Sequence, residues 1–95
     1  MFQFSDKNIE YLYDIILSLK TKEECHAFFE DICTVKELQD IAQRLKVARM
    51  LKEGNSYQEV SRETGASTAT ISRVNKCLET GSGYALVIKK IGVEK

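Results

Sequence analysis

Residues 56–76, SYQEVSRETGASTATISRVNK, contain two short helical patterns separated by Gly65. Ser56 followed by Glu59 three positions later is a capping box, in which each side chain accepts a hydrogen bond from the other residue's backbone N–H. This pattern predicts a helix over 57–64, because glycine favours the left-handed conformation found just past a helix end. The first helix is therefore expected to have barely two turns.

The second pattern begins after Ser67, whose hydroxyl can accept a hydrogen bond from a backbone N–H of the next turn. Apolar residues at helical spacing extend this second helix over 68–79. Three apolar side chains are placed to pack the two helices against each other: Val60, Ile71 and Val74. Two helices joined by a tight glycine turn form a helix-turn-helix, which the sequence predicts at 57–76.

Short side chains fill the outward positions on the first turns of the second helix. They are followed by two cations, and the full set is Ser67, Thr68, Ala69, Thr70, Ser72, Arg73 and Lys76. A helix that enters the DNA major groove needs short side chains at its amino-terminal end, since long ones hold its backbone away from the base edges. Hydroxyls bond to bases or phosphates, a methyl group can contact the thymine methyl, and first-turn N–H groups attract phosphate. The pattern therefore predicts sequence-specific DNA binding.

Two other interpretations of these residues stay open. Ser67 taken alone can serve only as a helix cap. A helix-turn-helix can also act as a protein–protein interaction module that does not bind specific DNA. The two functions differ in measurable terms, because only a DNA reader loses affinity when a base-facing side chain is changed or salt is added.

The rest of the chain is also helical in pattern. Apolar residues recur at three- and four-residue steps, proline is absent, and all five glycines lie in the second half. Including the helix-turn-helix, the expected helices span about 5–20, 22–33, 35–53, 57–64, 68–79 and 83–90. No strand is required, so we expect an all-α fold in a single domain over 1–95.

Charge is balanced overall but uneven along the chain. Residues 1–34 hold three lysines and seven acidic residues, a net charge of −4, whereas residues 35–95 hold eleven basic and seven acidic residues, a net charge of +4. The second part of the chain can therefore face the phosphates of a nucleic acid. The alternative is a chance fluctuation in a short sequence.

The sequence has no pattern typical of an enzyme, a metal site or a cofactor. Cys25, Cys33 and Cys77 lack the C-x-x-C spacing of zinc ligands and do not suggest a disulfide framework, so we expect reduced thiols that pack between helices. The only histidine, His26, adjoins Cys25, but adjacent helical residues point about 100° apart and do not form a nucleophile and base pair.

Membrane insertion and secretion are not expected either. No apolar run approaches the roughly 18 residues that a membrane span needs. The amino-terminal sequence MFQFSDKNIE lacks the basic region, apolar stretch and cleavage site of a secretory signal. We therefore expect a cytoplasmic protein with no membrane partner.

The run TGASTATISRVNKCLETGSGY, with QRLKVARMLKEGNSYQEV before it, resembles the Trp repressor superfamily and most closely its YerC/YecD branch. The likeness covers roughly residues 12–90 and is most specific in ATISR, residues 69–73. It implies a six-helix protomer that forms an intertwined homodimer, with the helix-turn-helix left as the DNA-reading part. It also implies a transcriptional regulator of the repressor type.

The resemblance assigns roles to single residues. Thr68, Ala69 and Thr70 match positions that face the bases, and Ser72 matches a threonine that contacts phosphate. Two further positions, Gln58 and Ser61, fall where the repressor has basic residues near DNA. This departure is expected to weaken the electrostatic part of DNA binding.

A small effector is a separate question. The repressor holds its tryptophan between two arginines, which Arg44 and Arg73 match in this chain. Val74 and Cys77 stand where the repressor has a glycine and a serine, so the space for an indole can be blocked. The alternative is that both arginines pair with nearby acids or contact phosphate. No effector or cofactor is established by the sequence.

The long helix over 35–53 supports a dimer independently of the resemblance. It carries two apolar faces, one with Leu38, Ile41, Leu45, Ala48 and Leu51 and the other with Val47 and Met50. A small helical bundle does not cover both faces, whereas a second copy of the chain does. Two recognition helices related by a two-fold axis would enter successive major grooves about 34 Å apart, which predicts a palindromic operator.

Overall fold

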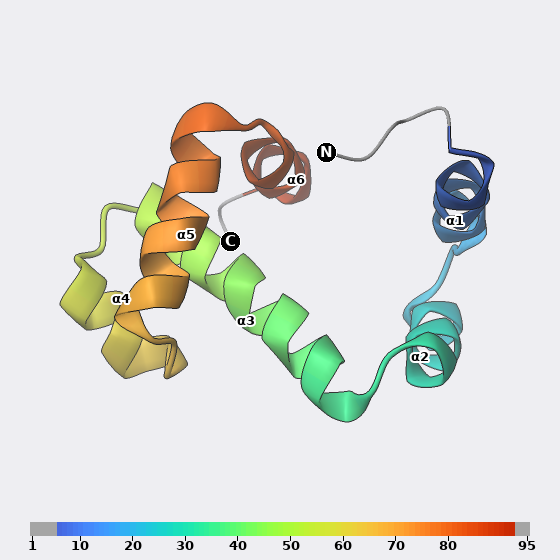
Figure 1. The fold of residues 1–95 in the computed structure, drawn as a ribbon, viewed down its shortest axis with the longest axis horizontal. Helices are drawn as coiled ribbons and strands as arrows, with labels where there is room; N and C mark the ends of the chain where they lie inside the picture. Colours follow the sequence, from blue (N-terminus) through green and yellow to red (C-terminus); the bar gives the residue numbers. More distant parts are fainter. Residues whose placement is uncertain (1–5, 93–95) are drawn as a thin grey trace. The chain divides into compact units, whose positions relative to one another are not determined.

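The computed structural model describes residues 6–92, and over that range the chain is all-α, with helices and no strand (Figure 1). The helices are α1 (Lys7–Ser18), α2 (Lys22–Ile32), α3 (Val35–Lys52), α4 (Tyr57–Thr64), α5 (Thr68–Thr80) and α6 (Gly83–Ile91). The expected all-α class with six helices is confirmed. The chain divides into two compact units, Met1–Val35 and Lys36–Lys95, which are described separately below.

The first unit holds α1 and α2, each started by a side-chain cap. Asp6 accepts hydrogen bonds from the N–H groups of Asn8 at 2.9 Å and Ile9 at 3.3 Å, so α1 begins at Lys7. The expected start at residue 5 lies outside the described residues. Leu19 is extended and ends α1 two residues earlier than the expected 5–20. None of the residues of α1 and α2 is buried, so their apolar side chains have no core within this unit.

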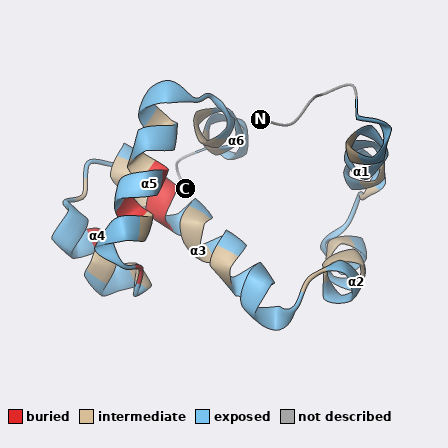
Figure 2. Ribbon diagram, viewed as in Figure 1, coloured by how far each residue is buried: buried red, intermediate tan, exposed pale blue. Residues whose placement is uncertain are grey.

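The second unit has a small core formed by the end of α3 together with α4 and α5 (Figure 2). Its buried residues are Val47, Ala48, Val60, Ala66, Ile71 and Val74. The three residues expected to pack the helix-turn-helix are all in this set, which confirms that prediction. Each fully buried valine or isoleucine side chain in this core stabilises the fold by about 1.5–3 kcal/mol. α5 packs against both α4 and α6 (Figure 1).

The long helix α3 is buried only near its carboxyl-terminal end. Val47 and Ala48 are fully buried, whereas Leu38, Ile41 and Leu45 are 37–43% exposed. The apolar stripe expected on this helix is therefore only partly covered within the second unit. The exposed part of the stripe lies on the turns of α3 that precede the buried Val47 and Ala48.

The cysteines differ in their surroundings. Cys25 and Cys33 are half-buried, whereas Cys77 on α5 is exposed, so the expectation that all three pack between helices is wrong for Cys77. Residues 6–92 contain no cluster of metal-ligating side chains. No helix in the same range is long and apolar enough to cross a membrane.

Candidate nucleic-acid interface

Helix α4 begins and ends with the local signals seen in the sequence. The Ser56 N–H donates to Glu59 Oε1 at 2.7 Å, and the Glu59 N–H donates to Ser56 Oγ at 3.1 Å, which confirms the capping box. The backbone N–H of Ser56 holds the pKa of the Glu59 carboxyl below its ordinary value of 4.5. Gly65 ends the helix in the left-handed conformation, with φ 76° and ψ 4°.

The turn between α4 and α5 is held by side-chain hydrogen bonds. Thr64 Oγ1 donates to the Val60 carbonyl at 2.7 Å and accepts from the Ala66 N–H at 3.1 Å. Ser61 Oγ donates to the Ala66 carbonyl at 2.9 Å. Because Ala66 is only 3% exposed, these bonds satisfy the N–H and carbonyl groups of the buried residue of the turn. The turn therefore sets the position of the first residue of α5.

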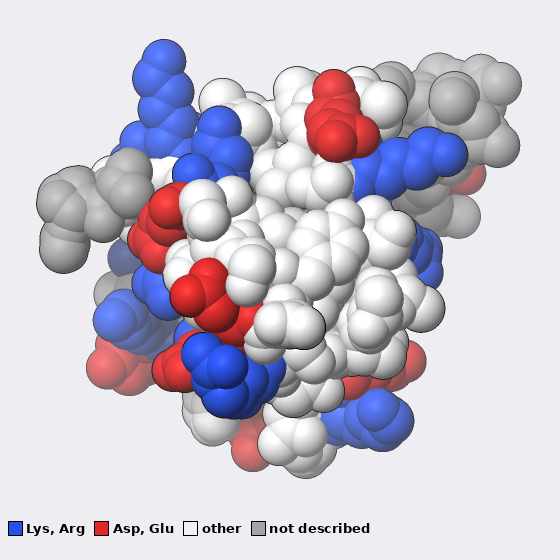
Figure 3. All heavy atoms as spheres, turned by 90° about the vertical axis from the view of Figure 1, so that its left-hand side faces the viewer, with Lys and Arg blue, Asp and Glu red and all other residues white. Residues whose placement is uncertain are grey.

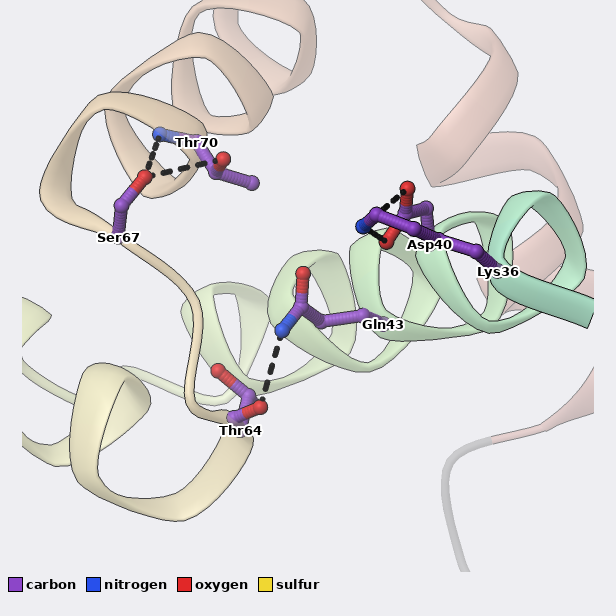
Figure 4. A network of polar contacts seen from close by, with 6 residues as sticks. All are labelled: Lys36, Asp40, Gln43, Thr64, Ser67 and Thr70. Atoms are coloured by element: carbon purple, nitrogen blue, oxygen red, sulfur yellow. Dashed lines mark hydrogen bonds and ion pairs between the residues drawn. The ribbon is translucent and has the colours of Figure 1, made fainter.

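A longer-range contact connects this turn to α3. Gln43 Nε2 donates to the Thr64 carbonyl at 3.1 Å across 21 residues of sequence (Figure 4). The bond is partly buried and satisfies a carbonyl of the last turn of α4. Gln43 thus holds the helix-turn-helix against α3. Sequence reasoning missed this residue, since nothing in the local pattern links positions so far apart.

Helix α5 begins at a serine cap, as expected. Ser67 Oγ accepts from the Thr70 N–H at 3.1 Å and also donates to Thr70 Oγ1 at 3.1 Å (Figure 4). The first bond satisfies one of the N–H groups that lack a partner at a helix start. In the second bond Thr70 Oγ1 is the acceptor, so the Thr70 O–H stays available as a donor.

The sequence-predicted DNA contacts differ in exposure. The exposed members are Gln58, Ser67, Thr68, Ala69, Ser72, Arg73 and Lys76. Ser61 and Thr70 are half-buried, and both have hydroxyls engaged in the hydrogen bonds described above. The exposed residues of α5 therefore offer short side chains to a partner, followed by two cations one turn further along.

Figure 3 shows the surface on the left-hand side of Figure 1, where α4 and α5 lie. Uncharged side chains cover its broad central area, and basic and acidic side chains lie around that area. The uncharged centre suits contact with base edges, and only the basic side chains at the border suit contact with phosphates.

A groove lies between the outer side of α4 and the first residue of α5. It has a volume of about 340 Å³ and is lined by Tyr57, Gln58, Ser61, Arg62 and Thr68. The groove brings two predicted DNA contacts of α4 together with one of α5. Tyr57 and Arg62 were not among the residues predicted from the sequence, where each resembles an ordinary surface residue of a short helix.

The two candidate effector arginines lie on different helices of the second unit. Arg44 is half-buried on α3, and Arg73 is exposed on α5. Within residues 6–92 neither forms an ion pair, and Asp40 pairs instead with Lys36, with Nζ and Oδ2 3.3 Å apart (Figure 4). The acids expected as partners of the two arginines therefore do not pair with them within residues 6–92.

A cavity of about 490 Å³ lies between α3, α5 and α6. It is lined by Leu45, Cys77, Gly81, Gly83, Tyr84 and Val87, and neither arginine contributes to this lining. Cys77 thus stands at a cavity wall, where the resemblance placed it in an effector pocket. The expected pairing of Arg44 with Arg73 around a ligand stays a prediction.

A helix-turn-helix supported by a longer helix is the architecture of a large class of DNA-binding proteins. Residues 7–91 match the family model described as Trp repressor protein, and the chain belongs to this family. The family is one of regulators rather than of enzymes. The resemblance inferred from ATISR and its surroundings is therefore confirmed.

Individual relatives agree with this assignment. The chain is 54% identical to YerC from Bacillus subtilis over 86 residues, which cover 90% of this chain and 83% of that protein. A TrpR-like protein from Eubacterium eligens has a crystal structure with a TM-score of 0.91, 46% identity and 96% coverage of both chains. A Staphylococcus aureus protein gives a TM-score of 0.89 at 44% identity, covering 94% of this chain and 90% of its own.

Proposed function

We propose that this protein is a sequence-specific DNA-binding transcriptional regulator that acts as a repressor, in the form of a dimer on a palindromic operator. The observation that carries the proposal is the exposed, short-side-chain start of α5, placed on a turn whose polar groups are satisfied. Membership of the Trp repressor family supports it. Such a regulator would act in the cytoplasm, where the bacterial chromosome is accessible.

In the proposed complex the start of α5 enters the major groove. Thr68, Ala69 and Thr70 face the bases, while Ser72 contacts phosphate. Ser67 donates to Thr70 Oγ1, which leaves the Thr70 O–H as a free donor, so Thr70 can contact a base edge through its hydroxyl or a thymine methyl through its own methyl group. The first-turn N–H groups and the helix dipole add a phosphate site.

Charged and polar residues further along the two helices would contact the DNA backbone. The proposed set is Gln58, Ser67, Arg73 and Lys76, whereas Ser61, whose hydroxyl donates to the Ala66 carbonyl, shapes the surface beside them. These contacts position the protein on the duplex without reading its sequence. Their charges account for the salt dependence that we expect of binding.

Dimerisation is supported by the apolar surface that a single chain leaves exposed. Large exposed apolar residues occur on α1, α2, α3 and α6, including Leu17 at 79%, Val35 at 74%, Leu86 at 58% and Ile91 at 86%. A monomer rarely exposes so many large apolar side chains, whereas a second copy can bury them. We propose that the two units form a single domain within this dimer.

One surface is especially suited to the second copy. A mostly apolar groove of about 440 Å³ between α3 and α6 is lined by Leu45, Lys46, Arg49, Val87, Ile88, Ile91 and Gly92. The apolar faces of the partner's acidic first unit would fit this groove, with Lys46 and Arg49 attracting its carboxylates. Light scattering at micromolar concentration should give the mass of a dimer. A monomer alone would contradict this part of the proposal.

A binding experiment with matched variants tests DNA reading. Thr70→Ala changes a proposed base contact, whereas Thr80→Ala changes a threonine in the last turn of the same helix, whose hydroxyl donates to the Lys76 carbonyl. We expect Thr70→Ala to weaken binding to the operator by about 1–3 kcal/mol, and Thr80→Ala to leave the affinity unchanged. Equal affinities for wild type and both variants would favour the alternative function, a protein–protein interaction module.

An amino-acid effector between Arg44 and Arg73 is a second, separable proposal. Neither guanidinium has an ion-pair partner within residues 6–92, so both can bind a carboxylate. Calorimetry with the amino acids, with and without operator DNA, tests this idea. The absence of heat together with an unchanged DNA affinity would exclude it.

A further inference from the structure

The groove between α4 and α5 contains one cation that the proposed DNA contacts leave out. Arg62 is exposed in the last turn of α4, and it lines the groove with Tyr57, Gln58, Ser61 and Thr68. Val60 on the same helix is fully buried, so the groove lies on the side of α4 that faces away from the core. Thr68, the first residue of α5, forms part of its wall.

The Arg62 guanidinium is available to a ligand. Glu63 follows it directly in the sequence, whereas Glu59, three residues earlier on α4, uses its Oε1 to accept the Ser56 N–H at 2.7 Å in the capping box. The hydrogen bond from the Ser56 N–H lowers the pKa of Glu59 most, and the positive charge of Arg62 lowers it least. In the part of the chain that the structure describes, Arg62 forms no ion pair. All five of its donors therefore remain free for another partner.

The other groove residues suit an anion rather than a second cation or an apolar group. Gln58 offers an amide N–H and Tyr57 a phenol O–H, and both groups commonly contact DNA phosphates. Ser61 donates its hydroxyl to the Ala66 carbonyl, so it shapes the wall instead of donating to a ligand. The groove thus combines a guanidinium with two neutral donors in its lining, and arginine binds phosphate with two parallel hydrogen bonds.

We propose that this groove binds a phosphate of the DNA backbone and that Arg62 supplies its positive charge. The inference rests on the proposed function, because DNA seated against Thr68 at the start of α5 lies next to the groove. It also explains how the chain tolerates uncharged residues at Gln58 and Ser61, where the family resemblance places basic ones. Arg62, one residue after Ser61 on α4, carries the positive charge instead.

The salt dependence of DNA binding tests the assignment. Arg62→Gln removes the cation, Arg62→Lys keeps the charge but not the paired donors, and Lys36→Gln removes a cation near the start of α3, outside the groove, as the control. Affinity is measured by fluorescence anisotropy on the operator duplex and on an unrelated duplex at several salt concentrations. Each phosphate contact contributes about 0.9 to the slope of log affinity against log salt.

For Arg62→Gln we expect the same fold-loss on both duplexes and a slope reduced by about 2 for a dimer with two grooves. Arg62→Lys should keep most of the slope, and Lys36→Gln should leave it unchanged. An unchanged slope for Arg62→Gln, in a protein whose wild type binds the operator, would overturn the phosphate site while leaving the proposed function intact. Loss confined to operators with one particular base would also overturn it, because Arg62 would then read a base.

Absence of saturable binding by the wild type would instead remove the proposed function, and the inference with it. Circular dichroism checks that each variant is folded. If Arg62→Gln does not fold, ethylation of single phosphates gives an independent test with Arg62→Lys and wild type. We expect ethylation of one phosphate per half-site, beside the start of α5, to weaken binding of both wild type and Arg62→Lys, and the absence of interference at any phosphate there would contradict the proposal.

Discussion

Replacement of Gly65 by alanine should destabilise the helix-turn-helix through backbone conformation alone. Gly65 has a φ of 76°, and a Cβ placed on it meets no heavy atom within 4 Å. An L-residue in this left-handed region costs about 1–2 kcal/mol. Alanine also restricts the unfolded chain, which offsets about 0.4–1 kcal/mol of that cost. The net loss of unfolding free energy is therefore about 1 kcal/mol.

Thermal and urea unfolding followed by circular dichroism measure this loss. In a domain of this size, a loss of about 1 kcal/mol lowers the midpoint temperature by roughly 4–8 °C. Protein concentration must be the same for all variants, because the stability of a dimer depends on concentration. Gly65→Asn should fall between glycine and alanine, since asparagine tolerates the left-handed region better.

Gly83→Ala is the matched control. A Cβ at Gly83 also meets nothing within 4 Å, but this residue is the first of α6 and has no positive φ. Alanine has the higher helix propensity, so Gly83→Ala should keep or slightly raise stability. Equal stability of Gly65→Ala and wild type, or an equal loss at Gly83, would refute the argument that the turn requires a left-handed residue.

The remaining predictions concern the same scaffold. Gln43→Ala removes the bond to the Thr64 carbonyl and should cost about 1 kcal/mol in urea unfolding, whereas an unchanged midpoint would show that the bond contributes nothing. Ile71→Ala should cost about 2–5 kcal/mol because Ile71 is fully buried, and a loss below 1 kcal/mol would contradict its central place in the core. The capping-box contribution of Glu59 should be complete well above pH 4.5 and disappear as pH falls through its lowered pKa, since protonation removes the charged acceptor. Glu59→Gln should remove that part of the pH dependence, measured by unfolding between about pH 2 and pH 7, and identical profiles for both proteins would refute it.

Local signals predicted the helices well because they act over a few residues. The capping box of Ser56 and Glu59, the cap at Ser67 and the left-handed Gly65 are each determined by neighbouring backbone groups. Burial of the three apolar residues of the helix-turn-helix follows from helical periodicity. The early end of α1 was not predicted, because apolar spacing continues past Ser18 although the backbone becomes extended at Leu19.

Contacts between distant residues could not be predicted from these patterns. The bond from Gln43 to the Thr64 carbonyl joins positions 21 residues apart, and no periodicity relates them. Amphipathic spacing identifies apolar faces but not which of them the second unit covers, so the exposure of Leu38, Ile41 and Leu45 emerged only from the structure. The bond between the Ser67 and Thr70 hydroxyls depends on side-chain rotamers, which the sequence pattern does not determine.

Direct selection of DNA by the purified protein tests the central claim, that the start of α5 reads a specific sequence. Genomic fragments are incubated with the protein, the bound fraction is sequenced, and the enriched sequence is verified by titration. The account predicts saturable binding to a two-fold symmetric site whose half-sites are about one helical turn apart. A bound pool with the same sequences as the input, and no saturable retardation of any fragment even in dilute buffer, would contradict it.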